Sequence, residues 1–210
     1  MNKIKIFLYV MLLSVLAFSC KDDSLNPIVP WESAVHGYAK FTATSPTNFA
    51  LGDKSKTLDL NFQWVSIDGT NTVNKIEFFV AFNENYNDVE NNVRTANHDT
   101  LLLRTIEGSA VPGNRTNVNF KITQDELYNL YKDITFDYGN GPENVLGRTP
   151  RTLNAPFTTR DRFVLTWALT TTDGRYFDSW SNSTCTEFET YRGTRTNDGG
   201  FNCVVNWTVR

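Results

Sequence analysis

The chain has 210 residues, with 20 Lys and Arg against 23 Asp and Glu, and its formal net charge is −3. A mildly acidic chain without basic clusters argues against binding to nucleic acid or docking on anionic lipid. A chain of this length can bury enough surface for one core, so we expect a single folded domain.

The first 20 residues have the layout of a secretory signal. Lys3 and Lys5 precede an apolar run over residues 6–18, which is too short to span a bilayer because that takes about 20 apolar residues. The run ends at Cys20, and Phe18-Ser19 is a poor match to the A-x-A site of an ordinary signal peptide. A cysteine at this point resembles a bacterial lipoprotein signal, which implies that residues 1–19 are removed and that Cys20 is diacylated.

The residues after Cys20 indicate the cellular location of the protein. Lys21, Asp22 and Asp23 resemble the short acidic tag with which Bacteroidota-type lipoproteins are exported to the outer leaflet of the outer membrane. The alternative is a solvated linker. Residues 20–34 contain two prolines and are expected to form a stiff tether that holds the domain off the bilayer. We therefore expect a lipid-anchored protein that faces the cell exterior.

Beyond the tether, apolar and polar residues alternate with period two, the pattern of half-buried strands. Turn signals separate these runs at Asp68-Gly69, Pro112-Gly113-Asn114 and Asp173-Gly174. The predicted strands cover residues 38–43, 58–64, 76–82, 101–106, 118–122, 163–169 and 205–209.

One short helix interrupts the strands. Thr123 and Glu126 form a capping box, and apolar residues follow at helical spacing up to Ile134. Two polar segments, residues 83–97 and 137–159, are expected to be long loops, where specificity is commonly found. Many short strands without a βαβ rhythm predict an all-β fold, an antiparallel sandwich over residues 35–210 with one capping helix and two long loops.

The cysteine count is odd at three, and lipidation of Cys20 explains the odd one. Cys185 and Cys203 then remain in an oxidising compartment, where a pair tends to form a disulfide. Two buried free thiols are the alternative. A metal pair is disfavoured, because His36 and His98 lie far away in sequence and there is no CxxC motif.

The sequence contains no recognisable catalytic motif. Its two histidines lie outside any nucleophile–base pattern, and a carboxylate pair such as Asp173 with Glu187 has nothing to single it out. Oxygen-bearing side chains crowd residues 85–90, but the central glycine of an EF-hand is missing, so we expect a turn and no calcium site. We expect no enzymatic activity, no metal and no cofactor.

Aromatic residues near loops are candidates for stacking on a glycan. The alternative is that they fill the edge of the core, as aromatic side chains in sheets often do. The candidates are Trp180, Tyr176, Tyr191, Tyr138 and Tyr86.

These patterns resemble a family, the SusE-type or related SusCD-associated lipoproteins. The resemblance rests on residues 60–64, 68–69, 73–80, 120–123, 161–167 and 172–175. It implies an immunoglobulin- or fibronectin-III-like sandwich behind a lipid anchor. It also implies a non-enzymatic accessory subunit of nutrient uptake, close to a TonB-dependent transporter and a SusD-like lipoprotein.

The chain departs from that family in length, because it is too short for the additional C-terminal carbohydrate-binding modules of SusE-like proteins. This departure favours an interaction module, with a free-standing surface glycan binder as the alternative. Ser24 and Thr100 lie in Asp-Ser-Leu and Asp-Thr-Leu triplets that resemble the O-glycosylation sites of such bacteria.

Overall fold

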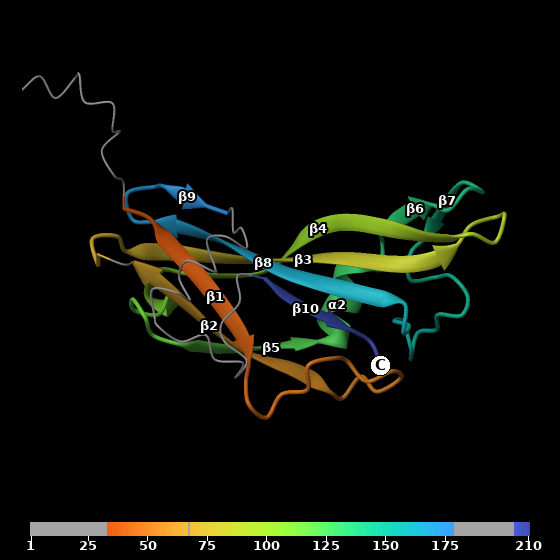
Figure 1. The fold of residues 1–210 in the computed structure, drawn as a ribbon, viewed down its shortest axis with the longest axis horizontal. Coiled ribbons are helices and arrows are strands. Elements are labelled where there is room, and N and C mark those ends of the chain that lie inside the picture. The colour runs from red at the N-terminus through yellow and green to blue at the C-terminus, as the bar shows by residue number, and fades with distance from the viewer. Residues whose placement is uncertain (1–32, 67, 179–203) are drawn as a thin grey trace, which may run out of the picture. The chain divides into compact units, whose positions relative to one another are not determined.

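Two antiparallel sheets pack face to face in the computed structural model, which describes residues 33–66, 68–178 and 204–210 (Figure 1). The first sheet has the order β1-β2-β5 and the second β10-β8-β3-β4, with β9 paired to β8. The strands are β1 Val35–Phe41, β2 Thr57–Ser66, β3 Val73–Asn87, β4 Val93–Glu107, β5 Val118–Thr123, β8 Asp161–Thr171, β9 Tyr176–Phe177 and β10 Val205–Thr208. This division of strands is that of an immunoglobulin-like sandwich.

The predicted strands all occur, because period-two alternation and turn chemistry are local signals. Gly69 and Gly174 adopt positive φ angles of 73° and 85°, which glycine reaches without strain. They lie in the connections from β2 to β3 and from β8 to β9, where Asp-Gly predicts a turn.

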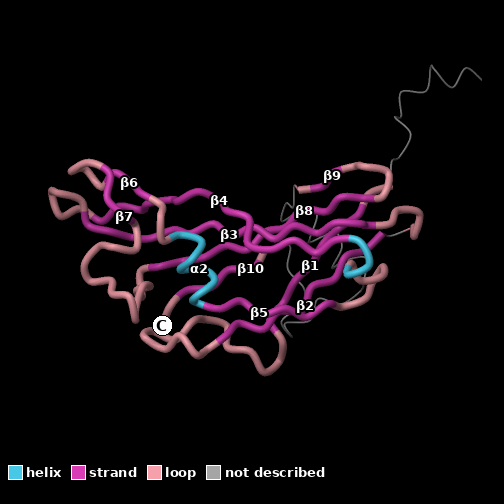
Figure 2. The backbone as a smooth tube through the Cα atoms, turned by 180° about the vertical axis from the view of Figure 1, so that it is seen from behind, coloured by secondary structure: helices cyan, strands magenta, loops and turns pink. Residues whose placement is uncertain are grey.

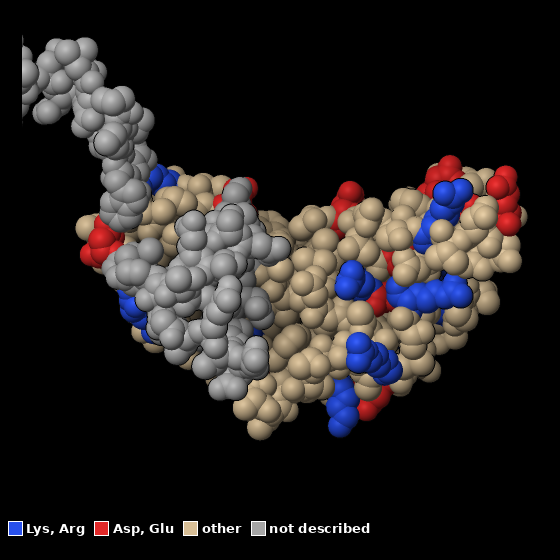
Figure 3. Space-filling view, in the orientation of Figure 1, with Lys and Arg blue, Asp and Glu red and all other residues tan. Residues whose placement is uncertain are grey.

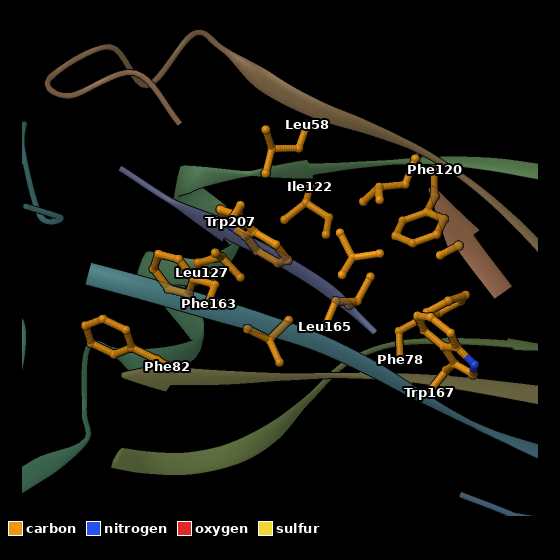
Figure 4. Close-up of a cluster of buried hydrophobic side chains, with 14 of the residues drawn as sticks. Leu58, Phe78, Phe82, Phe120, Ile122, Leu127, Phe163, Leu165, Trp167 and Trp207 are labelled. Atoms are coloured by element: carbon orange, nitrogen blue, oxygen red, sulfur yellow. The ribbon is translucent and has the colours of Figure 1, made fainter. Parts of the chain in front are cut away.

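The core lies between the inward faces of the two sheets (Figure 4). Phe62 of β2 packs edge-on against Phe78 of β3 and Trp167 of β8, with ring centroids 4.9 and 5.4 Å apart. Stacked rings of Phe163 and Trp207, 5.5 Å apart, continue the core towards the other end. Every second residue is buried over most of β3 and β8 and over the first half of β2, as expected for a sandwich, whereas residues 62–66 of β2 are buried on both faces.

The helix α2, Gln124–Tyr131, joins the two sheets (Figure 2). Its capping box is present: the amide of Glu126 donates to the Thr123 hydroxyl at 3.0 Å, and the amide of Thr123 donates to the Glu126 carboxylate at 2.9 Å. The helix contacts both β5 and β4, which are edge strands of the two sheets. It therefore covers one side of the core with Leu127 and Tyr131, both fully buried.

The prediction of a long loop at residues 83–97 is wrong. Residues 83–97 are a β-hairpin extension, in which β3 and β4 continue as paired strands around a turn at residues 88–92. Since β8 begins at Asp161, opposite Glu84, the hairpin extends beyond β8; we call residues 83–97 the arm. Its polar composition resembled a loop because one of its faces is solvated and turn-forming residues are concentrated at its tip.

The other expected loop is largely confirmed. It begins at the last residue of the short strand β6, Thr135–Asp137, and contains the strand β7, Pro142–Asn144, which pairs with β6 as a small hairpin. Apart from an isolated bridge between Thr152 and Ala155, residues 145–160 run to β8 without a strand or helix. A 3-10 turn, Gly108–Ala110, follows β4. In the described part of the chain no helix is long and apolar enough to cross a membrane.

Candidate functional site

A cluster of buried charges lies where the arm leaves the sandwich. Arg151, in the connection between β7 and β8, donates from Nη1 and Nη2 to the two carboxylate oxygens of Asp161 at 2.6 and 2.8 Å. The same Nη2 also donates to Glu84 of β3. All three residues are at most 9% exposed. Buried charges are retained only when they are paired and hydrogen-bonded, and these three satisfy one another.

Three further side chains extend the cluster around Glu84. His98 of β4 lies 3.3 Å from a Glu84 oxygen, and the Tyr138 hydroxyl donates to the same oxygen. The guanidinium carbon of Arg148 lies 3.3 Å from the centroid of the Tyr138 ring. Thus β3, β4, the β6–β7 hairpin and residues 145–160 are held together by one carboxylate and its partners.

The pKa values of the two carboxyl groups in the cluster, Glu84 and Asp161, are shifted in opposite directions. Burial opposes ionisation of Glu84, but hydrogen bonds from His98 and Tyr138 and the charge of Arg151 outweigh burial and lower its pKa to about 2. Burial raises the pKa of Asp161. The hydrogen bonds and charge of Arg151 oppose this increase only in part, and the negative charge of Glu84 raises the pKa further. Burial and the bonded Glu84 carboxylate also raise the pKa of the Tyr138 phenol.

Two adjoining hollows open beside the cluster. One, of about 430 Å³, lies between β3 residues 84–87, residues 148–151 and residues 158–160. The second, of about 470 Å³, extends from Asn83 and Asn97 to Thr208. They share Asn85, Thr159 and Arg160, and we call the pair the trough. Figure 3 shows basic side chains on the half of the molecule that carries the arm, with acidic ones towards its tip.

The structure brings two of the expected aromatic residues together and separates a third. Tyr86 and Tyr138 lie edge-on with centroids 4.8 Å apart, but Tyr138 is 4% exposed and Arg148 covers its ring. Tyr138 is therefore part of the buried cluster and has no free ring for stacking. Tyr86 is half-buried and lines the trough, whereas Tyr176 is 52% exposed on β9, paired with the opposite end of β8. Trp180 and Tyr191 lie outside the described residues.

The oxygen-rich segment at residues 85–90 forms a turn. Asp88 accepts hydrogen bonds from the backbone amides of Glu90 and Asn92 at 3.0 and 2.8 Å, and from Arg94 at 2.9 Å. These bonds lower the pKa of Asp88. The described residues contain no group of three or more His, Cys, Asp or Glu side chains that could hold a metal ion.

Several expected sites lie outside the described residues. They are Cys20, Lys21, Asp22, Asp23 and Ser24 near the N-terminus, and Cys185, Cys203 and Glu187 near the C-terminus. Thr100 is exposed on β4, opposite Ala81 of β3. His36 lies in β1, where burial lowers its pKa, and His98 belongs to the charge cluster.

The functional residues that sequence reasoning missed are Arg148, Arg151 and Arg160. All three lie within or next to residues 137–159, the segment predicted to be a specificity loop. The position of that predicted loop was therefore a signal from which these arginines could have been found. Arg151 and Glu84 are 67 positions apart, however, and no local pattern connects them.

Comparisons with known proteins add little. No protein-family model matches the sequence, and no curated protein matches it. Among solved structures, the chain is similar to an ApaA protein from Bordetella pertussis, with 10% identity and a TM-score of 0.21 over 73% of this chain and 90% of that one. So low a score carries no argument about fold or function.

Proposed function

We propose that this protein is an outer-membrane lipoprotein that faces the cell exterior and serves as a non-enzymatic accessory subunit of a SusC/SusD-like uptake complex. Its anchor would be the lipid on Cys20, with Lys21, Asp22 and Asp23 as the export tag. The immunoglobulin-like sandwich would be the part that contacts a TonB-dependent transporter and its SusD-like lipoprotein.

The observation that carries the docking role is the free edge of β4. Within the described residues, this 15-residue strand pairs only with β3, and an unpaired edge offers backbone groups to a partner chain. Leu102 of β4 is 47% exposed, and Phe79, opposite it in register, is half-buried. An edge strand with an exposed apolar residue is suited to docking on another protein.

The buried charge cluster supports a binding role and not a catalytic one. Glu84, Arg151 and Asp161 bond to one another, so their donors and acceptors are used in holding the fold. A general base would need a carboxylate or imidazole that reaches an open substrate site. His98, the nearest imidazole, is 7% exposed and lies against Glu84.

A pull-down of the tagged, lipidated protein in mild detergent tests the proposal. We expect a transporter and its lid lipoprotein to co-purify in near-equal amounts. Leu102→Asp should reduce their recovery, whereas Leu153→Asp, at an exposed residue of the 145–160 connection, should not. If the wild-type protein arrives alone, the accessory role is wrong.

The location needs its own experiment. We expect protease added to intact cells to remove the domain, and we expect Cys20→Ser to release the protein from the membrane fraction. Persistence of the full-length protein after protease treatment would place it inside the outer membrane.

A second candidate function is a free-standing surface glycan binder. The observation that favours it is the trough, one hollow of which is lined by the half-buried Tyr86 and by the amide residues Asn85 and Asn87. Sugars pair an apolar ring face with an aromatic side chain and their hydroxyl groups with amides. This candidate replaces the accessory role if no partner co-purifies.

A further inference from the structure

We propose that the trough binds an acidic saccharide, a sugar chain that carries carboxylate or sulfate groups. The inference deepens the second candidate function and rests on it, and it requires neither the lipid anchor nor a transporter. Neutral glycans, for which stacking on aromatic residues would suffice, are not the ligand class that the charges of the trough favour.

The trough is large enough for more than one sugar ring. Its two hollows, of about 430 and 470 Å³, each lie within the size range of ligand pockets and share three lining residues. It runs from the 148–151 segment, past the start of β8, and onto the outward face of the arm.

Three guanidinium groups lie along this path with donors to spare. Arg148 approaches Glu84 at 3.8 Å and Glu143 at 3.4 Å, both longer than a charge-assisted hydrogen bond of about 2.8 Å. Arg160 is exposed, and its guanidinium group donates to the Asn87 side-chain oxygen at 3.2 Å. Arg162 is exposed, and neither it nor Arg160 forms an ion pair with an acid in the described part of the chain. Guanidinium groups match carboxylate and sulfate oxygens with paired donors.

Side-chain amides fill the space between the arginines. Asn83 lies opposite Asn97 on β4 and opposite Arg162 on β8, so the three side chains form a row across three strands. In the next row towards the tip, Asn85 lies opposite Thr95. Asn83 and Asn97 offer amide donors and acceptors, and Asn85, whose oxygen accepts from the Thr95 hydroxyl at 2.9 Å, offers its NH2 group; such groups suit the hydroxyl groups of a sugar.

The wall of the trough is held in place before any ligand arrives. Arg151 bonds residues 145–160 to both β3 and β8, and its Nη1 also donates to the Pro156 carbonyl at 2.8 Å. A preformed wall lowers the entropic cost of binding. The buried charges, which also line the floor of the two hollows, thus hold the segment that carries Arg148 and Arg160.

Nucleic acid is the competing polyanion and fits less well. Non-specific binding to single strands combines a basic groove with several aromatic side chains on which bases stack. Tyr86 is the single aromatic residue among those that line the two hollows. The whole chain is also acidic, with a net charge of −3, so general attraction of polyanions is weak.

Affinity electrophoresis of the full-length lipidated protein in detergent tests the inference. The gels contain pectate, alginate, hyaluronate or chondroitin sulfate, and matched gels contain each polymer after carboxyl reduction or desulfation. A separate gel contains single-stranded DNA. We expect retardation by at least one acidic polysaccharide and its loss in the matched neutral polymer. Comparing the carboxylate polymers with the sulfated one identifies which anion is bound.

Matched variants show whether the trough is responsible. Arg160→Gln and Arg162→Gln should each weaken binding about tenfold, the effect of losing one charged hydrogen bond. Lys121→Gln removes the same charge from an exposed residue of β5, in the other sheet, and should leave binding unchanged. Circular dichroism of each variant verifies the fold.

The inference is wrong if none of the acidic polymers retards the protein, or if reduced polymers retard it equally. It is also wrong if Lys121→Gln weakens binding as much as Arg160→Gln does, or if DNA binds as tightly as the polysaccharide. If the protein binds no acidic polysaccharide but a transporter co-purifies with it, the saccharide inference is wrong and the proposed accessory role is unaffected. Conversely, glycan binding by a protein that purifies alone would make glycan binding its function.

Discussion

Arg151 and Asp161 form a two-point ion pair in the interior, with both terminal guanidinium nitrogens on both carboxylate oxygens at 2.6 and 2.8 Å. The pair closes a stretch of ten positions and fixes residues 151–161 against the start of β8. Because the same guanidinium reaches Glu84 on β3, one side chain joins three segments. The cluster therefore holds residues 145–160, which form the wall of the trough, in a fixed position.

The first prediction concerns Arg151, at the centre of the buried charge cluster. Arg151→Met leaves two buried carboxylates without their cation, and we expect it to lower the free energy of unfolding by about 3–5 kcal/mol. Urea denaturation followed by tryptophan fluorescence measures the loss. Arg160→Met, at an exposed arginine nine positions along the chain, is the control and should change stability by less than about 0.5 kcal/mol. Equal effects of the two substitutions would contradict the assigned role of Arg151.

The second prediction concerns pH. The pKa of Glu84 is lowered to about 2 in the folded protein from an ordinary value of 4.5, so its ionised form stabilises the fold. That contribution, on the order of 3 kcal/mol, is complete above pH 4.5 and is lost as pH falls towards 2. We expect Glu84→Gln to be less stable than wild type at pH 7 and the difference to shrink below pH 4.5.

Denaturant unfolding of both proteins between pH 7 and pH 3 provides the measurement. Asp161, whose pKa is raised mainly by burial, is present in both proteins; Glu84→Gln also removes a charge that raises this pKa, so the comparison reports Glu84 together with its coupling to Asp161. A difference that stays constant over this range would show that Glu84 is not held ionised by its partners.

The third prediction concerns the helix. The Tyr131 hydroxyl lies 2.6 Å from the Val80 carbonyl and 3.1 Å from the Asp99 carbonyl, close to the point where the β3–β4 register shifts after Ala81. Tyr131→Phe should cost about 1–2 kcal/mol, because buried carbonyls then lose their donor. Tyr128→Phe, on the same helix, should be nearly neutral. Thermal unfolding of both variants measures the contrast, and equal melting temperatures would refute it.

The fourth prediction concerns Gly37. A methyl group there would lie 2.6 Å from Trp167 Cδ1 and 3.0 Å from Phe62 Cζ, both in the core. We expect Gly37→Ala to destabilise the fold by about 1–3 kcal/mol through overpacking. Gly113→Ala places its methyl 3.5 Å from Thr116, an ordinary contact, and serves as the control. If both variants unfold at the wild-type denaturant concentration, β1 does not pack on Trp167 as described.

Local chemistry explains which elements were predictable. The capping box of Thr123 and Glu126 and the Asp-Gly pairs involve residues at most three positions apart, so they can be recognised in sequence alone. The arm was mistaken for a loop because Glu84 and Tyr86 occupy the inward positions that Ile76, Phe78, Val80 and Phe82 occupy earlier in β3. Alternation continued through the arm, but its apolar members were replaced by a carboxylate and a phenol.

The sequence by itself determined the sandwich, its turns and its capped helix, because these follow from periodicity and from contacts between near neighbours. It also predicts a lipid anchor at Cys20, because the signal for such an anchor is a linear motif. Only the tertiary structure decided that Glu84, Arg151 and Asp161 meet and that Tyr138 is buried beneath Arg148. Those contacts join residues from different strands and connections. Burial and pairing, which govern what a charged group does, become defined only when the chain has folded.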